Sequence, residues 1–134
     1  MVDASDAVQW YLQDEPYANI SARVLDALDA GGVLLAAPDH IRYEIASALY
    51  VASKQNLARL TESQVDRALD AFLRVRLDTH NDGELIREAI SVARSCTIAF
   101  YDGLYVALAQ RLGVPLITAD RKLYERIRHL PEAL

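Results

Sequence analysis

The sequence is short of cysteine, of long apolar runs and of positive charge. Its one cysteine, Cys96, excludes a disulfide framework and any zinc site built from several cysteines, and suits a reducing cytoplasm. No apolar run approaches the roughly 20 residues that cross a bilayer, and no signal peptide is expected at the start. The net charge of −5 argues against a simple basic coat for nucleic acid. We therefore expect a cytoplasmic protein that does not bind membranes.

What is present is enough apolar material for one core. The chain has 134 residues, of which 52% are hydrophobic and 25% charged. This composition excludes disorder and fibrous repeats, and the length predicts a single domain over residues 1–134. Seven tyrosines against two phenylalanines are typical of half-buried surfaces and favour a homodimer.

Short apolar runs alternate with segments in which apolar residues recur at helical spacing. Strands are expected near 1–2, 33–37, 75–77 and 114–118. Helices are expected through 8–12, over about 17–30, 38–54, 61–72, 84–94 and 98–112, and from about 120 onward. We expect Pro38 in the first turn of its helix and the run 33–37 to be buried on both faces. The pattern predicts a compact three-layer α/β/α domain around a parallel sheet.

Two aspartates follow predicted strands. Asp3 comes after the first strand and Asp120 after the last, so both are expected at the same edge of the sheet, where ligands bind in open parallel sheets. The alternative is that each simply caps the helix that begins after it, which aspartate does well.

Two further acids lie on apolar helices. Glu44 is three residues after Ile41, so its carboxylate is expected along the apolar face and to need a cation, a hydrogen-bond donor or a proton. A salt bridge to an arginine is the ordinary alternative. Asp102 lies near the start of a helix that is apolar on almost every side, and Gly103 beside it indicates close packing or the approach of a ligand.

These four acids could share one pocket, where their mutual repulsion would call for a divalent cation. The pocket would offer oxygen ligands, with no cysteine and no obvious pair of histidines. Such a donor set favours a hard metal, Mg²⁺ or Mn²⁺.

Four segments of the chain carry a resemblance to a known family. They are Val2-Asp3-Ala4-Ser5, Pro38 with Glu44 and Leu49, Tyr101-Asp102-Gly103-Leu104-Tyr105-Val106-Ala107-Leu108-Ala109, and Leu116-Ile117-Thr118-Ala119-Asp120. In this order and spacing they resemble the PIN domain, and within it the VapC-type toxins of prokaryotic toxin–antitoxin pairs. The similarity covers nearly the whole chain, from Asp3 to about Leu123.

The resemblance implies a Mg²⁺- or Mn²⁺-dependent endoribonuclease with a sheet of four or five parallel strands, whose cleft an antitoxin occludes. By motif position the catalytic, metal-binding acids are Asp3, Glu44, Asp102 and Asp120. Ser5 and Thr118 match the hydroxyl positions that support the metal site. The alternatives are an inactive PIN-like binding scaffold, a PIN nuclease that is not a toxin, or a phosphoryl-transfer domain. The last needs an Asp-x-Asp that the segment after Val2 does not contain.

Basic residues should border an acidic pocket that binds RNA. Arg42, Arg121 and Lys122 are the candidates for phosphate contact, although each alone is better explained as a solvated helix residue. His40 lies four residues before Glu44, and we expect it to be an exposed histidine of the first helical turn rather than a ligand.

Overall fold

A computed structural model describes residues 1–54 and 59–132 of the chain. The elements follow one another as α1 (Ala4–Ala7), the 3-10 helix η1 (Val8–Trp10), α2 (Ala18–Asp29), β1 (Leu35–Pro38), α3 (Ile41–Ala52), α4 (Glu62–Arg74), β2 (Leu77–His80), the 3-10 helix η2 (Asp82–Leu85), α5 (Ile86–Cys96), α6 (Phe100–Leu112) and α7 (Arg121–Ile127). No helix in these described ranges is both long enough and apolar enough to traverse a membrane.

Four extended segments lie side by side at the centre. β1 and β2 pair in parallel, with Leu35 opposite Leu77. Val2 forms a parallel bridge with Ile117, and its backbone N–H donates to Ala36 O at 3.1 Å. The start of the chain therefore lies between β1 and the segment around Ile117. In the described residues two of these segments form strands and the other two contribute a single bridge.

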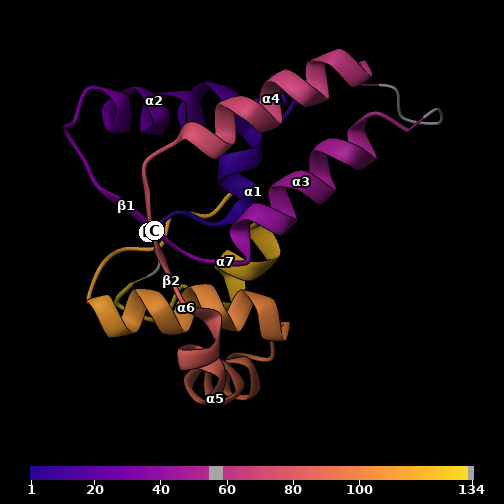
Figure 1. The fold of residues 1–134 in the computed structure, drawn as a ribbon. Helices are drawn as coiled ribbons and strands as arrows, with labels where there is room; N and C mark the ends of the chain where they lie inside the picture. Colours follow the sequence, from indigo (N-terminus) through magenta and orange to yellow (C-terminus); the bar gives the residue numbers. More distant parts are fainter. Residues whose placement is uncertain (55–58, 133–134) are drawn as a thin grey trace.

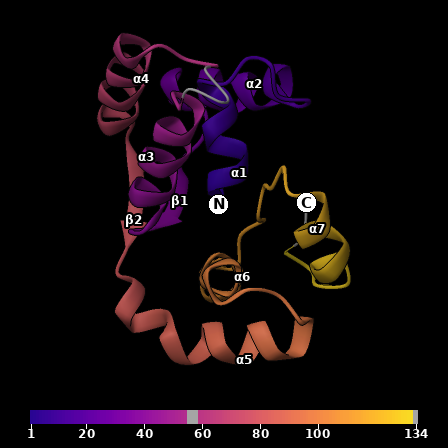
Figure 2. The same cartoon turned by 90° about the vertical axis from the view of Figure 1, so that its right-hand side faces the viewer.

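Helices lie on both sides of this central layer. Figures 1 and 2 show α2, α3 and α4 on one side of β1 and β2, and α5 with α6 on the other. Fully buried side chains of the helices, among them Ile45, Leu104 and Leu108, form one core with Val2 and Leu116 of the central segments. The α/β arrangement predicted from the sequence is thus present.

The prediction around β1 was wrong at both of its ends. Val33 and Leu34 are exposed, Leu34 by 91%, so the apolar run is not buried throughout and the strand begins at Leu35. Pro38 ends the strand rather than opening a helix. The Asp39 N–H bonds to His80 O at 2.9 Å, which keeps this segment beside β2, and α3 begins only at Ile41.

Other boundaries differ in kind or by a few residues. The predicted capping box is present, with Thr61 and Gln64 satisfying each other's backbone groups at the start of α4. The strand expected over 75–77 lies instead at Leu77–His80, because Val75 serves as the C-cap of α4. The helix expected over 84–94 is divided into η2 and α5. The first predicted helix is short and tightens into η1.

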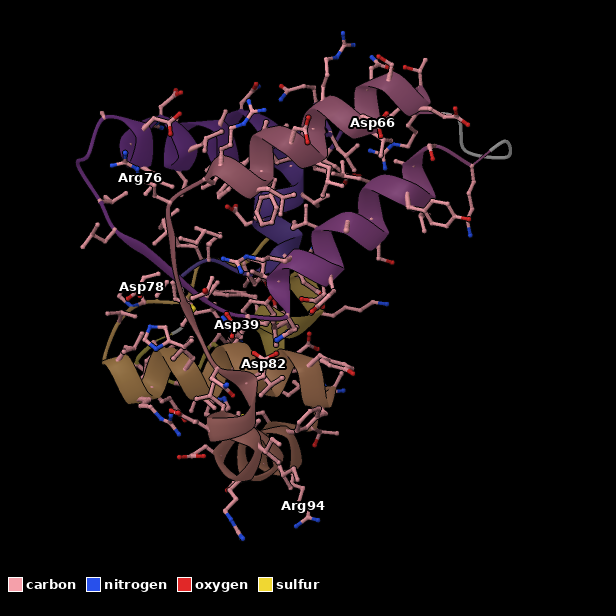
Figure 3. The ribbon with its side chains drawn as sticks, viewed as in Figure 1. Asp39, Asp66, Arg76, Asp78, Asp82 and Arg94 are labelled. Carbon is pink, nitrogen blue, oxygen red and sulfur yellow. The ribbon has the colours of Figure 1, made fainter. Side chains whose placement is uncertain are left out.

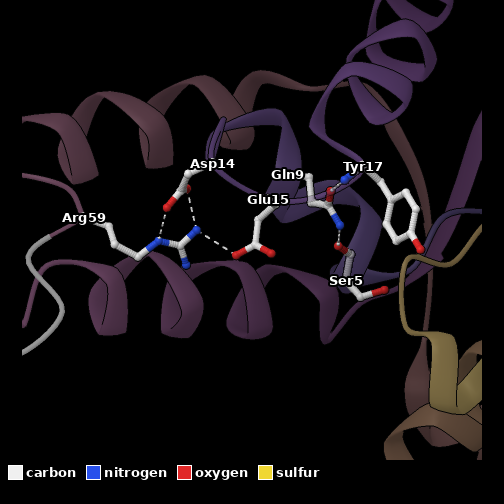
Figure 4. A network of polar contacts seen from close by, with 6 residues as sticks. All are labelled: Ser5, Gln9, Asp14, Glu15, Tyr17 and Arg59. Atoms are coloured by element: carbon white, nitrogen blue, oxygen red, sulfur yellow. Dashed lines mark hydrogen bonds and ion pairs between the residues drawn. The ribbon is translucent and has the colours of Figure 1, made fainter.

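An arginine ties the segment after α3 back to the first part of the chain. Arg59 donates from Nε to Asp14 Oδ2 at 2.7 Å and from its guanidinium to Glu15 Oε1 at 2.7 Å (Figure 4). The same figure shows Gln9 joining Ser5 O to the backbone N–H of Tyr17. These contacts hold the connection between α1 and α2 in place.

Candidate active site

The four predicted acids line one pocket. Asp3 follows the bridge residue Val2, Glu44 lies in the first turn of α3, Asp102 lies in the first turn of α6, and Asp120 precedes α7. Together with Ala4, Ser5 and Tyr105 they surround a cavity of about 190 Å³. The sequence thus brings to one place acids that are up to 117 positions apart, from Asp3 to Asp120.

Asp3 is buried, with 4% of its surface exposed. Its Oδ1 accepts a hydrogen bond from the Ser5 hydroxyl at 2.7 Å and another from the Asp6 N–H at 3.0 Å. Burial raises the pKa of Asp3 to about 6, even though the hydrogen bonds favour its charged form. The Asp3 carboxylate is therefore poised to take up a proton or a cation.

Ser5 and Thr118 join the two strand ends that carry aspartates. Their hydroxyl oxygens are 3.2 Å apart, and Ser5 Oγ accepts from the Ala119 N–H at 3.0 Å. Thr118 Oγ1 accepts from the Asp120 N–H at 3.0 Å. The hydroxyl groups thus set the position of Asp120 relative to Asp3.

Asp3 and Asp120 both serve as helix caps as well. Asp3 accepts from the N–H of Asp6 at the start of α1, and Asp120 Oδ1 accepts from the N–H groups of Lys122 and Leu123 at the start of α7. The prediction that these two aspartates cap helices is therefore correct, and capping is compatible with their position at the pocket. One oxygen of each can cap while the other is directed elsewhere.

Glu44 is held by a tyrosine rather than by an arginine. The Tyr105 hydroxyl donates to Glu44 Oε2 at 2.6 Å, and the Glu44 side chain is 38% exposed. The carboxylate is therefore less buried than the helical spacing predicted. Burial together with the charge of Glu44 raises the pKa of Tyr105 well above its ordinary value. Tyr105 thus stays protonated and remains a donor to Glu44.

His40 is buried, which corrects the expectation that it is exposed. Its ring nitrogens face two carboxylates, with Nε2 3.4 Å from Glu44 Oε2 and Nδ1 3.2 Å from Asp82 Oδ1, at angles that do not make hydrogen bonds. The His40 backbone N–H donates to Asp82 Oδ2 at 3.1 Å. Figure 3 shows Asp82 between the start of α3 and α6. The carboxylate from η2 and the ring packing of Tyr101 and Tyr105 around His40 account for its burial.

Asp102 is half-buried and close to other negative charges. Burial raises its pKa, and the charges of Asp120 and Glu44 raise it further. Gly103 beside it faces the neighbouring helix, since a Cβ there would lie 2.6 Å from Ala89 O. Of the two explanations for this glycine, close packing of α5 on α6 is correct.

The donor chemistry of the pocket suits a hard cation, because its charged groups are all carboxylates and its remaining polar side chains are hydroxyls. The raised pKa values of Asp3 and Asp102 show that their negative charges are incompletely compensated by the protein. Over residues 1–54 and 59–132, however, no three acidic, histidine or cysteine side chains are placed to hold one ion together. The pocket is a candidate by its lining and charge rather than as a finished ligand cage.

The three predicted basic residues are exposed, but they do not line the acidic pocket. Arg42 borders a neighbouring hollow with Asp39 and Tyr43. Arg121 and Lys122 lie in the first turn of α7, directly after Asp120. Arg121 and Lys122 are therefore within reach of a long polyanion that extends beyond the pocket.

Sequence reasoning missed the polar partners of the acids. Tyr105 and Asp82 had not been assigned to the site, and Asp6 is a further buried acid, whose Oδ1 accepts from Ser21 Oγ at 2.6 Å. Burial raises the pKa of Asp6. A signal was available for this pair, because a serine within the apolar stripe of a helix indicates a buried polar partner.

Comparison with known proteins adds to this geometry. Over residues 1–129 the sequence matches the PIN domain. Ribonuclease VapC3 of Pyrobaculum aerophilum is 32% identical over 127 residues, covering 94% of this chain and 92% of that protein. Ribonuclease VapC12 of Mycobacterium tuberculosis is 31% identical over 132 residues, covering 98% and 95%. Ribonuclease VapC3 of Mycobacterium tuberculosis is 37% identical over 87 residues, covering 65% and 61%.

Proposed function

The chain belongs to the PIN domain family, and we propose on this basis that it is an endoribonuclease and the toxin of a VapC-type toxin–antitoxin pair. The observation that carries the proposal is the set of four carboxylates around one small pocket. We take residues 1–134 as one domain of this type. We also expect the segments around Val2 and Ile117 to extend the sheet to four or five parallel strands, which their backbone hydrogen bonds support.

We assign Asp3, Asp102 and Asp120 to holding Mg²⁺ or Mn²⁺, directly or through water. Such a cation, when bound, supplies a water of lowered pKa and shields the charge that builds up on the phosphate. Glu44 is either a further ligand or the group that orients the attacking water. Tyr105 fixes the Glu44 carboxylate, and Ser5 with Thr118 fixes the spacing of Asp3 and Asp120. These residues therefore hold the carboxylates in position before RNA binds.

Arg42, Arg121 and Lys122 are proposed to contact phosphates of the RNA outside the pocket, because all three are exposed and the last two directly follow the pocket residue Asp120. The protein partner is proposed to be a cognate antitoxin that places a basic side chain among the carboxylates, since a guanidinium binds carboxylates bidentately. We also propose a homodimer, which the exposed apolar side chains of Ile20, Val33 and Leu34 support. Light scattering of the purified protein tests the dimer.

The direct test is cleavage of a wide panel of RNAs by the purified protein. We expect cleavage with Mg²⁺ or Mn²⁺ and none in EDTA. Asp3→Ala, Glu44→Ala and Asp120→Ala should each abolish cleavage while the far-UV circular dichroism stays that of the wild type. Arg94→Ala, on the exposed face of α5, is the matched control and should cut normally.

Two results would overturn the assignment of roles: cleavage that persists in EDTA, and cleavage that survives two of the three substitutions. If no RNA in the panel is cut, the alternative of an inactive PIN-like scaffold is favoured. If RNA is cut but the protein does not slow the growth of a host, a PIN nuclease that is not a toxin is favoured.

A further inference from the structure

A second and larger hollow adjoins the acidic pocket. It has a volume of about 700 Å³ and lies between α3, η2 and the start of α6. Its polar and aromatic lining consists of His40, Tyr43, Glu44, Ser47, Asp82 and Tyr101. Glu44 also lines the acidic pocket, so the two hollows share a wall. A molecule that occupies the acidic pocket with one part can therefore reach this second hollow with the next.

The hollow presents two aromatic rings to solvent. Tyr43 is 77% exposed and Tyr101 is 59% exposed. The Tyr101 ring lies 5.5 Å from the His40 ring and 5.6 Å from the Phe100 ring, so it packs against both rings while most of its surface remains uncovered. An exposed ring beside a polar site is suited to stacking against a flat partner.

The floor of the hollow is buried and polar. His40 is 6% exposed and lies between the carboxylates of Glu44 and Asp82, with the Tyr105 ring 4.9 Å away. Neither nitrogen of its ring makes a hydrogen bond within the described residues. The side chains of Glu44 and Asp82 are 38% and 31% exposed, although Asp82 Oδ1 is itself buried. Glu44 thus offers a carboxylate acceptor to a ligand next to the aromatic wall.

The charge of the lining decides which part of an RNA fits there. Glu44 and Asp82 are acidic, and no lysine or arginine is among the described residues that line the hollow. A phosphate would be repelled. A nucleobase is neutral and flat, and the exocyclic amino groups of adenine, cytosine and guanine donate to carboxylates.

We propose that this hollow holds one unpaired nucleobase of the RNA substrate, next to the bond that is cut, with the Tyr101 ring as the stacking surface. The proposal rests on the proposed ribonuclease function and adds to it a substrate class, namely RNA whose bases are unstacked at the cleavage site. Bases that carry an amino group are preferred over uracil, because uracil offers the acidic lining only its ring N–H. Stacking makes the contact tolerant of sequence in other respects.

The first test measures binding without any cleavage. Adenosine, cytidine, uridine and ribose are titrated in EDTA into ¹⁵N-labelled protein, and amide shifts are followed by NMR. We expect adenosine and cytidine to shift residues 40–48, 82 and 101, uridine to bind more weakly, and ribose not to bind. Tyr101→Ala should weaken adenosine binding by roughly 5- to 100-fold, the range that the loss of one base–aromatic stack produces.

Two variants serve as controls in this titration. Tyr101→Phe keeps the ring and should bind as the wild type does. Tyr50→Ala removes another exposed tyrosine of α3, one that does not line the hollow, and should have no effect. The proposal is overturned if no nucleoside shifts these residues at its solubility limit. Binding of ribose as strong as that of adenosine, or adenosine binding unchanged in Tyr101→Ala, overturns it equally.

The second test separates this proposal from the proposed function. In cleavage of single-stranded RNA, Tyr101→Ala should raise KM by roughly 5- to 100-fold and leave the dependence on Mg²⁺ concentration unchanged. If the wild type cuts RNA and Tyr101→Ala cuts it with the same KM, the base site is wrong and the ribonuclease stands. If no RNA is cut but nucleosides bind through Tyr101, the ribonuclease is wrong and the base site stands. If Tyr101→Ala changes only the binding of a protein partner, the hollow is a protein-docking site and the proposal fails.

Discussion

At the scale of single residues, the pocket combines acids that the protein compensates only in part. Asp3 shows this most clearly, because burial raises its pKa to about 6 while the same carboxyl in an unfolded chain titrates near 4. The folded protein therefore binds more protons than the unfolded chain between these values. The contribution of Asp3 to stability is fully present below about pH 4 and is lost as the pH rises through about 6.

We predict that the free energy of unfolding in EDTA, measured by urea denaturation, falls more steeply from pH 4 to pH 7 in the wild type than in Asp3→Asn. The difference between the two proteins should reach at most about 3 kcal/mol, given about 1.4 kcal/mol per pKa unit. Asparagine keeps an oxygen that can accept from Ser5 and Asp6, so the fold is preserved. If the pH profiles of the two proteins are parallel, burial does not raise the pKa of Asp3.

A second prediction concerns the hydroxyl that fixes Glu44. Tyr105→Phe removes the donor to Glu44 Oε2 and keeps the ring in the core. We expect kcat for RNA cleavage to fall about 10- to 100-fold, since a hydrogen bond to a charged group contributes about 1.5–3 kcal/mol. Tyr11→Phe is the control, because Tyr11 is half-buried and its hydroxyl donates to no group in the described residues. Equal kcat values in both variants would mean that Tyr105 does not position Glu44.

At the scale of helices and strands, the sequence predicted those elements that are determined by local apolar periodicity and capping. The helices α2, α4 and α6 were found because their apolar spacing, and the capping box of α4, are local properties of the chain. The limits of β1 were not found, because pairing with β2 and with Val2, both distant in sequence, decides which residues of the apolar run are covered. Leu34 is as apolar as Leu35 and nevertheless lies outside the strand.

For the acids too, position along helices and strands was predicted, whereas contacts with distant residues were not. Asp3, Glu44, Asp102 and Asp120 were predicted to share a pocket from strand ends and helical positions, and they do line one pocket. The hydrogen-bond partners of these acids come from distant parts of the chain, so the sequence did not predict them. For the same reason His40 was expected at the surface. Its burial results from Asp82, 42 residues later in the chain, and from the rings of Tyr101 and Tyr105. No local pattern around His40 contains that information.

Close packing of α5 on α6 leads to a third prediction. A methyl group at position 103 would meet Ala89 O at 2.6 Å, so the helices would have to move apart. We expect Gly103→Ala to lower the free energy of unfolding by about 1–3 kcal/mol. Gly32→Ala, where the nearest atom lies at 3.4 Å, is the matched control and should lose less. Urea denaturation of both variants checks this, and an unchanged Gly103→Ala would contradict the tight helix contact.

At the scale of the whole molecule, the proposed function predicts that one substitution can remove toxicity while antitoxin binding is kept. Expression of the chain alone should slow the growth of a host, and co-expression of the partner should restore growth. Asp102→Asn should remove toxicity without abolishing the complex, provided that the partner also binds an apolar groove by a helix. Growth curves and co-purification at matched expression check both halves. Equal growth inhibition by wild type and Asp102→Asn would argue that this chain is not a toxin.

The pocket can form only late during translation relative to Asp3, because residues far apart in the sequence line it. Asp3 emerges from the ribosome long before Asp120 and the Thr118 hydroxyl that joins it to Ser5, because 117 positions separate Asp3 from Asp120. A nascent chain can fold its first helices as they appear, but it lacks a wall of the pocket until residue 120 is outside. A ribosome is thus not exposed to a complete pocket by the chain that it is translating until residue 120 has left its exit tunnel.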